Sequence, residues 1–165
     1  MKQVYRDQMM TLWLGNAVDW PNKTWVDFVF TNPYGEMPIA LAKTPGIIHQ
    51  WEHRRTEAER WSHMKLSRVV SKWNRGREVF WANSHVVEFK ALDLVAYNPE
   101  SPGWYPEELV EDILSAYVRP GQTVWDGFMG RGTIGKVCRS MGIHYIGVEQ
   151  LERHMDLAKS YLEVA

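Results

Sequence analysis

The stretch Val-Trp-Asp-Gly-Phe-Met-Gly-Arg-Gly, residues 124–132, is a short apolar strand that ends in an acid and enters a turn with three glycines. Glycine has no Cβ, so the backbone of such a turn can approach a ligand closely. A helix is expected from Thr133 to Gly142, and the unpaired N–H groups of its first turn would face the same ligand. The pattern predicts a strand, a glycine turn and a helix that together bind a ligand.

The strand expected after this helix supplies a second acidic residue. It covers residues 144–148 and ends on Glu149. A carboxylate at this point of a βαβ unit can accept hydrogen bonds from both hydroxyls of a ribose. The glycines follow the order G-x-x-G-x-G, whereas a dinucleotide fingerprint has G-x-G-x-x-G. The sequence therefore predicts a site for an adenosine-containing ligand, and a glycine turn that binds nothing is the alternative.

The rest of the chain predicts further elements of an α/β domain. The segment 50–73 is expected to be mostly helical, because four apolar residues from Leu66 to Trp73 follow i, i+3, i+4, i+7 spacing. The βαβ unit comes last, although the nucleotide half of a doubly wound domain usually comes first. We therefore expect a circular permutation. The other expected elements are strands at about 10–14, 26–31 and 78–82, a strand pair or strand–turn element at 86–96, and a helix at 106–117.

Length and composition fit one globular domain over residues 1–165. Hydrophobic residues make up 45% and charged residues 24% of the chain, which is ordinary for a packed core. No apolar run is long enough to span a membrane and the N-terminus does not resemble a secretory signal, so a soluble, cytoplasmic protein without membrane contact is expected. The single cysteine, Cys138, excludes an intramolecular disulfide. The oligomeric state stays open, with a homodimer as one alternative.

Three motifs together resemble one enzyme family, the amino-group DNA methyltransferases that act on N6 of adenine or N4 of cytosine. Residues 126–133, Asp-Gly-Phe-Met-Gly-Arg-Gly-Thr, resemble the family motif D-P-F-x-G-S-G-T. Residues 26–35 are similar to V-D-L-I-x-T-D-P-P-Y-G, and residues 104–109 to the helix start E-K-P-x-E-L. The resemblance covers 10–36, a catalytic strand region, and 104–162, a cofactor-binding half. This order is that of the permuted β arrangement.

The resemblance implies a fold and a cofactor. The fold is a three-layer, Rossmann-like, circularly permuted α/β methyltransferase domain, whose mostly parallel sheet has an antiparallel strand near one edge. The cofactor is S-adenosylmethionine. In the family an acid near the adenine of the cofactor occupies the position of Asn16. The cofactor-binding residues that follow are Asn16, Asp126, Phe128, Gly130, Gly132, Thr133 and Glu149.

The tetrapeptide after the strand 26–31 would carry the reaction. An exocyclic amine is a poor nucleophile, because its lone pair is delocalised into the base. The side-chain oxygen of Asn32 and the carbonyl of Pro33 can accept its two N–H groups, while Tyr34 stacks on a flipped base. Transfer would be direct. Cys138 lies inside the helix after the glycine turn, so the thiolate chemistry of cytosine C5 methylation is disfavoured and a small buried thiol is expected.

A basic segment, residues 43–77, is the candidate DNA-binding region. It holds nine Lys or Arg and three Glu in a chain whose net charge is −1. Positive charge interleaved with tryptophan suits phosphate contact and base stacking, whereas the alternative is a solvated helix face. His49 and His53 have i, i+4 spacing, but no cysteine joins them, so no metal is expected. The residues chosen for DNA contact are Arg54, Arg55, Arg60 and Lys65.

Two functional hypotheses follow from these patterns. The first is an S-adenosylmethionine-dependent methyltransferase acting on an exocyclic amino group of DNA, with N6 of adenine ahead of N4 of cytosine. The second is a catalytically impaired descendant that binds nucleic acid or a protein partner. The family tetrapeptide has two prolines where this chain has only Pro33, and a large target-recognition insert has no room here. Both features favour the second hypothesis.

Overall fold

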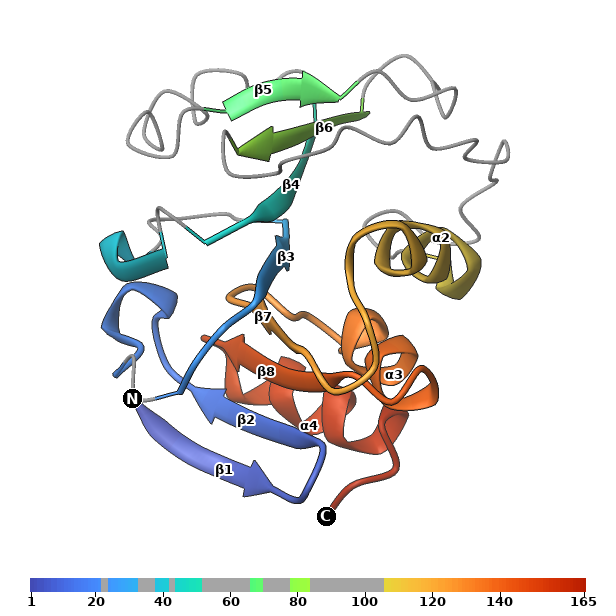
Figure 1. Ribbon diagram of the computed structural model, residues 1–165. Coiled ribbons are helices and arrows are strands. Elements are labelled where there is room, and N and C mark those ends of the chain that lie inside the picture. The colour runs from blue at the N-terminus through green and yellow to red at the C-terminus, as the bar shows by residue number, and fades with distance from the viewer. Residues whose placement is uncertain (22–23, 33–37, 42–43, 52–65, 70–77, 84–105) are drawn as a thin grey trace.

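The chain folds around one mixed β-sheet, shown in Figure 1. The computed structural model describes residues 1–21, 24–32, 38–41, 44–51, 66–69, 78–83 and 106–165. The strands are β1 (Lys2–Arg6), β2 (Met10–Leu14), β3 (Phe28–Thr31), β4 (Gly46–Trp51), β5 (Leu66–Val69), β6 (Glu78–Asn83), β7 (Thr123–Asp126) and β8 (His144–Glu149). The helices are α2 (Glu107–Tyr117), α3 (Thr133–Ser140) and α4 (Glu152–Tyr161), with short 3₁₀ turns η1 (Ala17–Asp19) and η2 (Ile39–Leu41).

Parallel strands form the centre of the sheet, and antiparallel strands lie at both edges. The strand order is β1-β2-β8-β7-β3-β4-β6-β5. Neighbours from β2 to β4 pair in parallel, whereas β1 pairs antiparallel with β2, and β6 pairs antiparallel with both β4 and β5. The mostly parallel α/β fold is therefore confirmed. The circular permutation stays a prediction.

Buried side chains cover both faces of the sheet, because successive residues of a strand point to opposite faces. Phe28 and Phe30 belong to a core cluster that also contains the apolar sides of α2, α3 and α4. Val29 and Trp125 belong to a second cluster with Trp20, which follows η1. Cys138 is fully buried within α3, as predicted, and burial raises the pKa of its thiol well above the usual value. The thiol is therefore a packing group.

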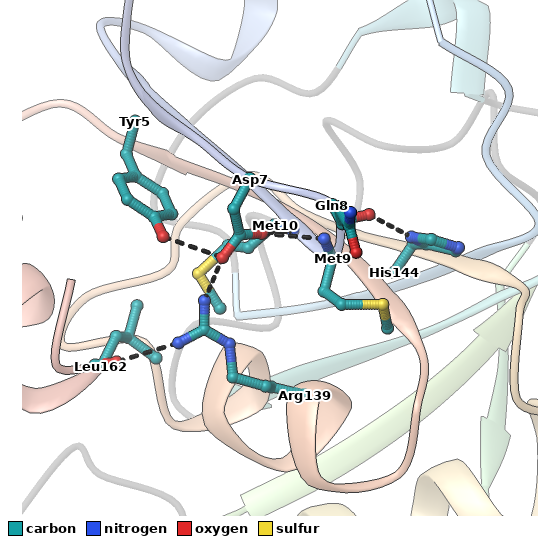
Figure 2. A network of polar contacts seen from close by, with 8 residues as sticks. All are labelled: Tyr5, Asp7, Gln8, Met9, Met10, Arg139, His144 and Leu162. Atoms are coloured by element: carbon teal, nitrogen blue, oxygen red, sulfur yellow. Dashed lines mark hydrogen bonds and ion pairs between the residues drawn. The ribbon is translucent and has the colours of Figure 1, made fainter.

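Figure 2 shows how the hairpin of β1 and β2 is tied to α3. Asp7, in the hairpin turn, accepts hydrogen bonds from the Tyr5 hydroxyl at 2.8 Å and the Met10 amide at 2.6 Å. Arg139, near the end of α3, pairs with the same carboxylate and donates to the carbonyl of Leu162 at 3.2 Å. One guanidinium thus joins the hairpin, α3 and the segment after α4, and it supports the helix that starts at the glycine turn.

The helix predicted over residues 50–73 is wrong where the structure describes that segment. Gln50 and Trp51 lie in β4, and Leu66 to Val69 form β5, which pairs with β6. Spacing of i and i+3 over so few residues cannot distinguish a helix from a short strand, and pairing with β6 decides the outcome. Residues 52–65 and 70–77 lie outside the described part, as does the predicted element at 86–96.

The other predicted elements agree with the structure. The strands predicted at 10–14, 26–31 and 78–82 correspond to β2, β3 and β6, and the helix at 106–117 corresponds to α2. No sequence pattern predicted β1, β4 or α4. Within the described residues, no helix is both long and apolar enough to cross a membrane.

Candidate functional site

The carboxyl ends of four neighbouring parallel strands bring the candidate residues to one edge of the sheet. Asp126 ends β7 and Glu149 ends β8, while Asn16 follows β2 and Asn32 follows β3. The Gly15 amide donates to the backbone carbonyl of Glu149 at 2.9 Å, so the ends of β2 and β8 are joined directly. Ligands of open α/β sheets bind beyond this edge, so these four residues define the candidate site.

The glycine turn between β7 and α3 needs its glycines for two different reasons. A Cβ at Gly127 would lie 2.1 Å from the Trp125 ring, so there is no space for a side chain. Gly130 and Gly132 have φ of 52° and 87°, a left-handed conformation that favours glycine. Apart from Gly130 itself and its two neighbours in the chain, no described atom lies within 4 Å of where a Cβ at Gly130 would be. The turn is closely packed against the sheet below and open at Gly130.

Glu149 connects the end of β8 to the glycine turn. Its side chain is mostly buried; Oε2 accepts from the Gly130 amide at 3.1 Å and Oε1 from the Leu151 amide at 2.8 Å. The Nδ1 atom of His154, in the first turn of α4, lies 3.6 Å from Oε1. A carboxylate offers about four lone-pair positions. Glu149 therefore keeps acceptor capacity for a ligand while its orientation is fixed by the backbone.

Asp126 points into the protein. Its side chain is 1% exposed. Oδ1 accepts from the Thr31 hydroxyl at 2.7 Å and from the Phe128 amide at 3.2 Å, and Oδ2 accepts from the Tyr145 hydroxyl at 3.1 Å. Burial raises the pKa of Asp126 to about 6; the hydrogen bonds from Thr31, Phe128 and Tyr145 oppose this shift, and the charge of Glu149 adds to it.

Neither Thr31 nor Tyr145 was among the predicted site residues. Both side chains are fully buried, and both hydroxyls bond to Asp126. Two signals in the sequence could have found Thr31: it is a polar residue at the end of the apolar run Phe28–Phe30, and it matches the threonine of the family motif aligned with residues 26–35. Tyr145 carries no comparable signal, because tyrosine is common in strands.

The remaining candidate residues have varied surroundings. Asn16 is exposed, and its Oδ1 accepts from the Val18 amide at 3.4 Å, so it caps η1. Asn32 is half-buried directly after β3, and Phe128 packs against the second core cluster. Thr133 is buried at the start of α3, after Gly132. Outside the described residues lie Pro33, Tyr34, Arg54, Arg55, Arg60 and Lys65.

Histidine spacing gives no support for a metal site. His49 lies in β4 and not on a helix, and His53 lies outside the described residues. In the part of the chain that the structure describes, no group of three or more His, Cys, Asp or Glu side chains could hold a metal ion.

The buried carboxyl of Asp126 should affect stability in a pH-dependent way. The pKa of Asp126 is about 6 in the folded protein and near 3.8 in the unfolded chain, so the folded state binds this proton more tightly than the unfolded state. Stability is therefore lost as the pH rises from about 4 to about 6. We expect the stability of Asp126→Asn relative to wild type to improve by about 2 kcal/mol between pH 4 and pH 7. Denaturant unfolding at pH 4 and pH 7 measures the difference.

A matched control for this comparison is Asp112→Asn, which changes an exposed aspartate on α2. Its stability relative to wild type should be the same at both pH values. If Asp126→Asn behaves like this control, Asp126 does not titrate in the manner described.

Comparison with known proteins assigns the fold and then the family. The fold is that of S-adenosylmethionine-dependent methyltransferases. The crystal structure of the M1.HpyAVI–SAM complex matches with a TM-score of 0.67 and 16% identity, covering 93% of this chain and 100% of that one. The cytosine-N4-specific PvuII DNA methyltransferase matches with a TM-score of 0.64 and 11% identity, covering 99% and 96%.

The family is shown by the sequence itself. The N6_N4_Mtase family model, described as DNA methylase, matches residues 2–160, so this chain belongs to that family. Type II methyltransferase M.Cfr9I of Citrobacter freundii is 26% identical over 141 residues, which are 83% of this chain and 43% of that protein. M.HinfI of Haemophilus influenzae is 35% identical over 57 residues, 34% of this chain and 16% of that protein. The chain thus spans less than half of these curated relatives.

Proposed function

We propose that this chain transfers a methyl group from S-adenosylmethionine to an exocyclic amino group of DNA, with N6 of adenine as the first target and N4 of cytosine as the alternative. The observation that carries the proposal is the common edge of β3, β7 and β8. It brings Asn32, a candidate acceptor for the amine, to the same side as Glu149 and the glycine turn. Membership of the N6_N4_Mtase family supports the reaction class.

The residues present fit the cofactor. Glu149 is held in place and has lone pairs left for ribose hydroxyls, and the turn is open at Gly130. Phe128 is partly exposed beside the turn, and Gly132 begins the helix with its first amides unpaired within α3. When bound, S-adenosylmethionine supplies an electrophilic methyl group on a sulfonium. Asn16 and Thr133 complete the proposed set, and Asp126 would act through the backbone of Phe128.

The target amine would be activated by groups just beyond β3. The Asn32 side-chain oxygen and the Pro33 carbonyl would accept hydrogen bonds from its two N–H groups and direct its lone pair toward the methyl group. Tyr34 would hold the base by stacking. No covalent intermediate with the protein is needed. The buried thiol of Cys138, whose pKa is raised by burial, is not a nucleophile for this reaction.

The decisive experiment is transfer of radiolabelled methyl groups to unmethylated genomic DNA. The proposal expects incorporation by the wild-type chain, and digestion to nucleosides then identifies N6-methyladenine or N4-methylcytosine. Single-stranded and double-stranded substrates are tested in parallel.

The single proline of the tetrapeptide favours the second candidate, a catalytically impaired protein that binds nucleic acid or a protein partner. Binding of DNA without incorporation would select it.

DNA binding should depend steeply on salt if the basic segment contacts phosphates. Replacing Arg54, Arg55, Arg60 and Lys65 by glutamine should reduce the slope of log K against log salt by roughly 3–4, because each phosphate contact contributes about 0.9. Fluorescence anisotropy with a labelled duplex at several salt concentrations measures the slope.

A control for the salt experiment is the pair Arg6→Gln and Arg119→Gln. Both side chains are exposed and lie near the amino ends of the parallel strands, opposite the candidate site. Their replacement should leave the slope nearly unchanged. An equal effect of both sets would mean that the four residues of the basic segment act only through net charge.

A further inference from the structure

The two strand ends that carry the proposed reaction are joined by a buried hydrogen bond between side chains. The backbone ladder of β3 and β7 pairs Phe28 with Val124 and Val29 with Trp125. Beyond this ladder, the Thr31 hydroxyl donates to Asp126 Oδ1 at 2.7 Å. The contact lies where chain direction across the sheet reverses, since β7 is followed through α3 by β8 on one side and β3 by β4 on the other. Such switch points are where α/β sheets bind ligands.

The same carboxylate also holds the glycine turn. Asp126 Oδ1 accepts a hydrogen bond from the Phe128 amide at 3.2 Å. The oxygen that accepts the hydrogen bond from the Thr31 hydroxyl therefore also fixes the first part of the turn. Thr31 is fully buried and immediately precedes Asn32. One oxygen atom therefore connects the residue before the proposed amine acceptor to the turn proposed to hold the methyl donor.

Tyr145 fixes the other oxygen of this carboxylate. Its hydroxyl donates to Asp126 Oδ2 at 3.1 Å. A Cβ at Gly135 would lie 2.6 Å from the tyrosine ring and a Cβ at Gly147 2.7 Å from it, so the ring is confined by both α3 and β8. A buried carboxyl requires such partners, because leaving it without hydrogen bonds would be costly. Asp126 is thereby held by hydrogen bonds from β3, the glycine turn and β8.

We propose that Thr31 and Asp126 are positioning residues for methyl transfer, which set Asn32 relative to the glycine turn through their shared hydrogen bond. The proposal rests on the proposed function. It gives Asp126 and Thr31 roles that act through contacts within the protein. Because placement errors of about 1 Å can reduce a rate about 10²-fold, loss of this bond should affect turnover before it affects cofactor affinity.

Three variants separate positioning from stability. Thr31→Val keeps the branched shape and removes the donor to Oδ1, so kcat should fall roughly 10- to 100-fold while the Kd for S-adenosylmethionine stays within about threefold. Thr31→Ser restores the hydroxyl and should recover most of kcat. Tyr161→Phe removes a part-buried hydrogen bond to Glu107 Oε1 that does not involve Asp126, and it should leave kcat within about threefold of wild type.

The measurements are single-turnover methyl transfer, calorimetric cofactor binding and thermal unfolding of all four proteins. Unchanged turnover in Thr31→Val, no recovery in Thr31→Ser, or an equal loss of turnover in Tyr161→Phe at equal Tm would overturn the positioning role and leave the proposed function standing. Absence of transfer by the wild type on all DNA substrates would instead overturn the proposed function and the positioning role with it.

Discussion

Methyl transfer by the Asn32→Ala variant should fall to background, a loss of at least about 10²–10³-fold, because the target amine would lose the acceptor that directs its lone pair. Asn32 follows β3 directly and is half-buried. Cofactor affinity should stay within a few-fold of wild type, since the lost group acts on the target base. Incorporation of labelled methyl groups and calorimetric titration with S-adenosylmethionine measure the two effects separately.

The control for this variant is Asn32→Asp, which keeps a side-chain oxygen at the same position. It should retain measurable transfer, as an acceptor is what the reaction needs. Full activity of Asn32→Ala would refute the mechanism. Equal inactivity of both variants, with normal folding, would mean that the amide group is needed for something other than accepting a hydrogen bond.

Replacement of Glu149 by alanine should weaken S-adenosylmethionine binding by about 1.5–3 kcal/mol, the range for hydrogen bonds to a charged group. The side chain lies at the end of β8, is mostly buried and is oriented by the amides of Gly130 and Leu151. Its remaining lone pairs are the ones proposed to accept the ribose hydroxyls. Isothermal titration calorimetry gives the affinity, and circular dichroism checks that the variant is folded.

Glu152→Ala is the matched control, because it removes an exposed carboxylate three residues further on, in the first turn of α4. It makes the same change in net charge and should leave the affinity unchanged. An unchanged affinity in folded Glu149→Ala would remove the ribose assignment. An equal loss in both variants would indicate a general electrostatic effect.

Local patterns predicted the fold from Thr123 to Glu149 well. The strand, turn, helix and strand from Thr123 to Glu149 appear as β7, α3 and β8, because glycines and apolar runs there act over short distances in sequence. The segment 50–73 shows the limit of such patterns. Leu66 and Val69 match a helical spacing, yet they form β5 through pairing with β6, a contact that no local pattern encodes.

The candidate site was predicted in part, for the same reason. The structure places Glu149 and Asn32 at one edge, as the strand pattern implies, but Asp126 turns inward to Thr31 and Tyr145. Thr31 and Asp126 are 95 residues apart in the sequence, so their hydrogen bond forms only when β3 and β7 are packed side by side in the sheet. An antiparallel strand was expected near one edge, whereas β1 and β6 place antiparallel pairs at both.

The confinement of the Tyr145 ring has a consequence for how this sequence can vary. Gly135 and Gly147 lie on different elements, yet a Cβ at either one would overlap the same ring. A larger residue at either position is compatible only with a smaller one at 145, and that change would remove the hydroxyl from Asp126. A side chain at position 135 or 147 therefore requires a change at position 145 as well, so Tyr145 limits which substitutions can be accepted on both α3 and β8.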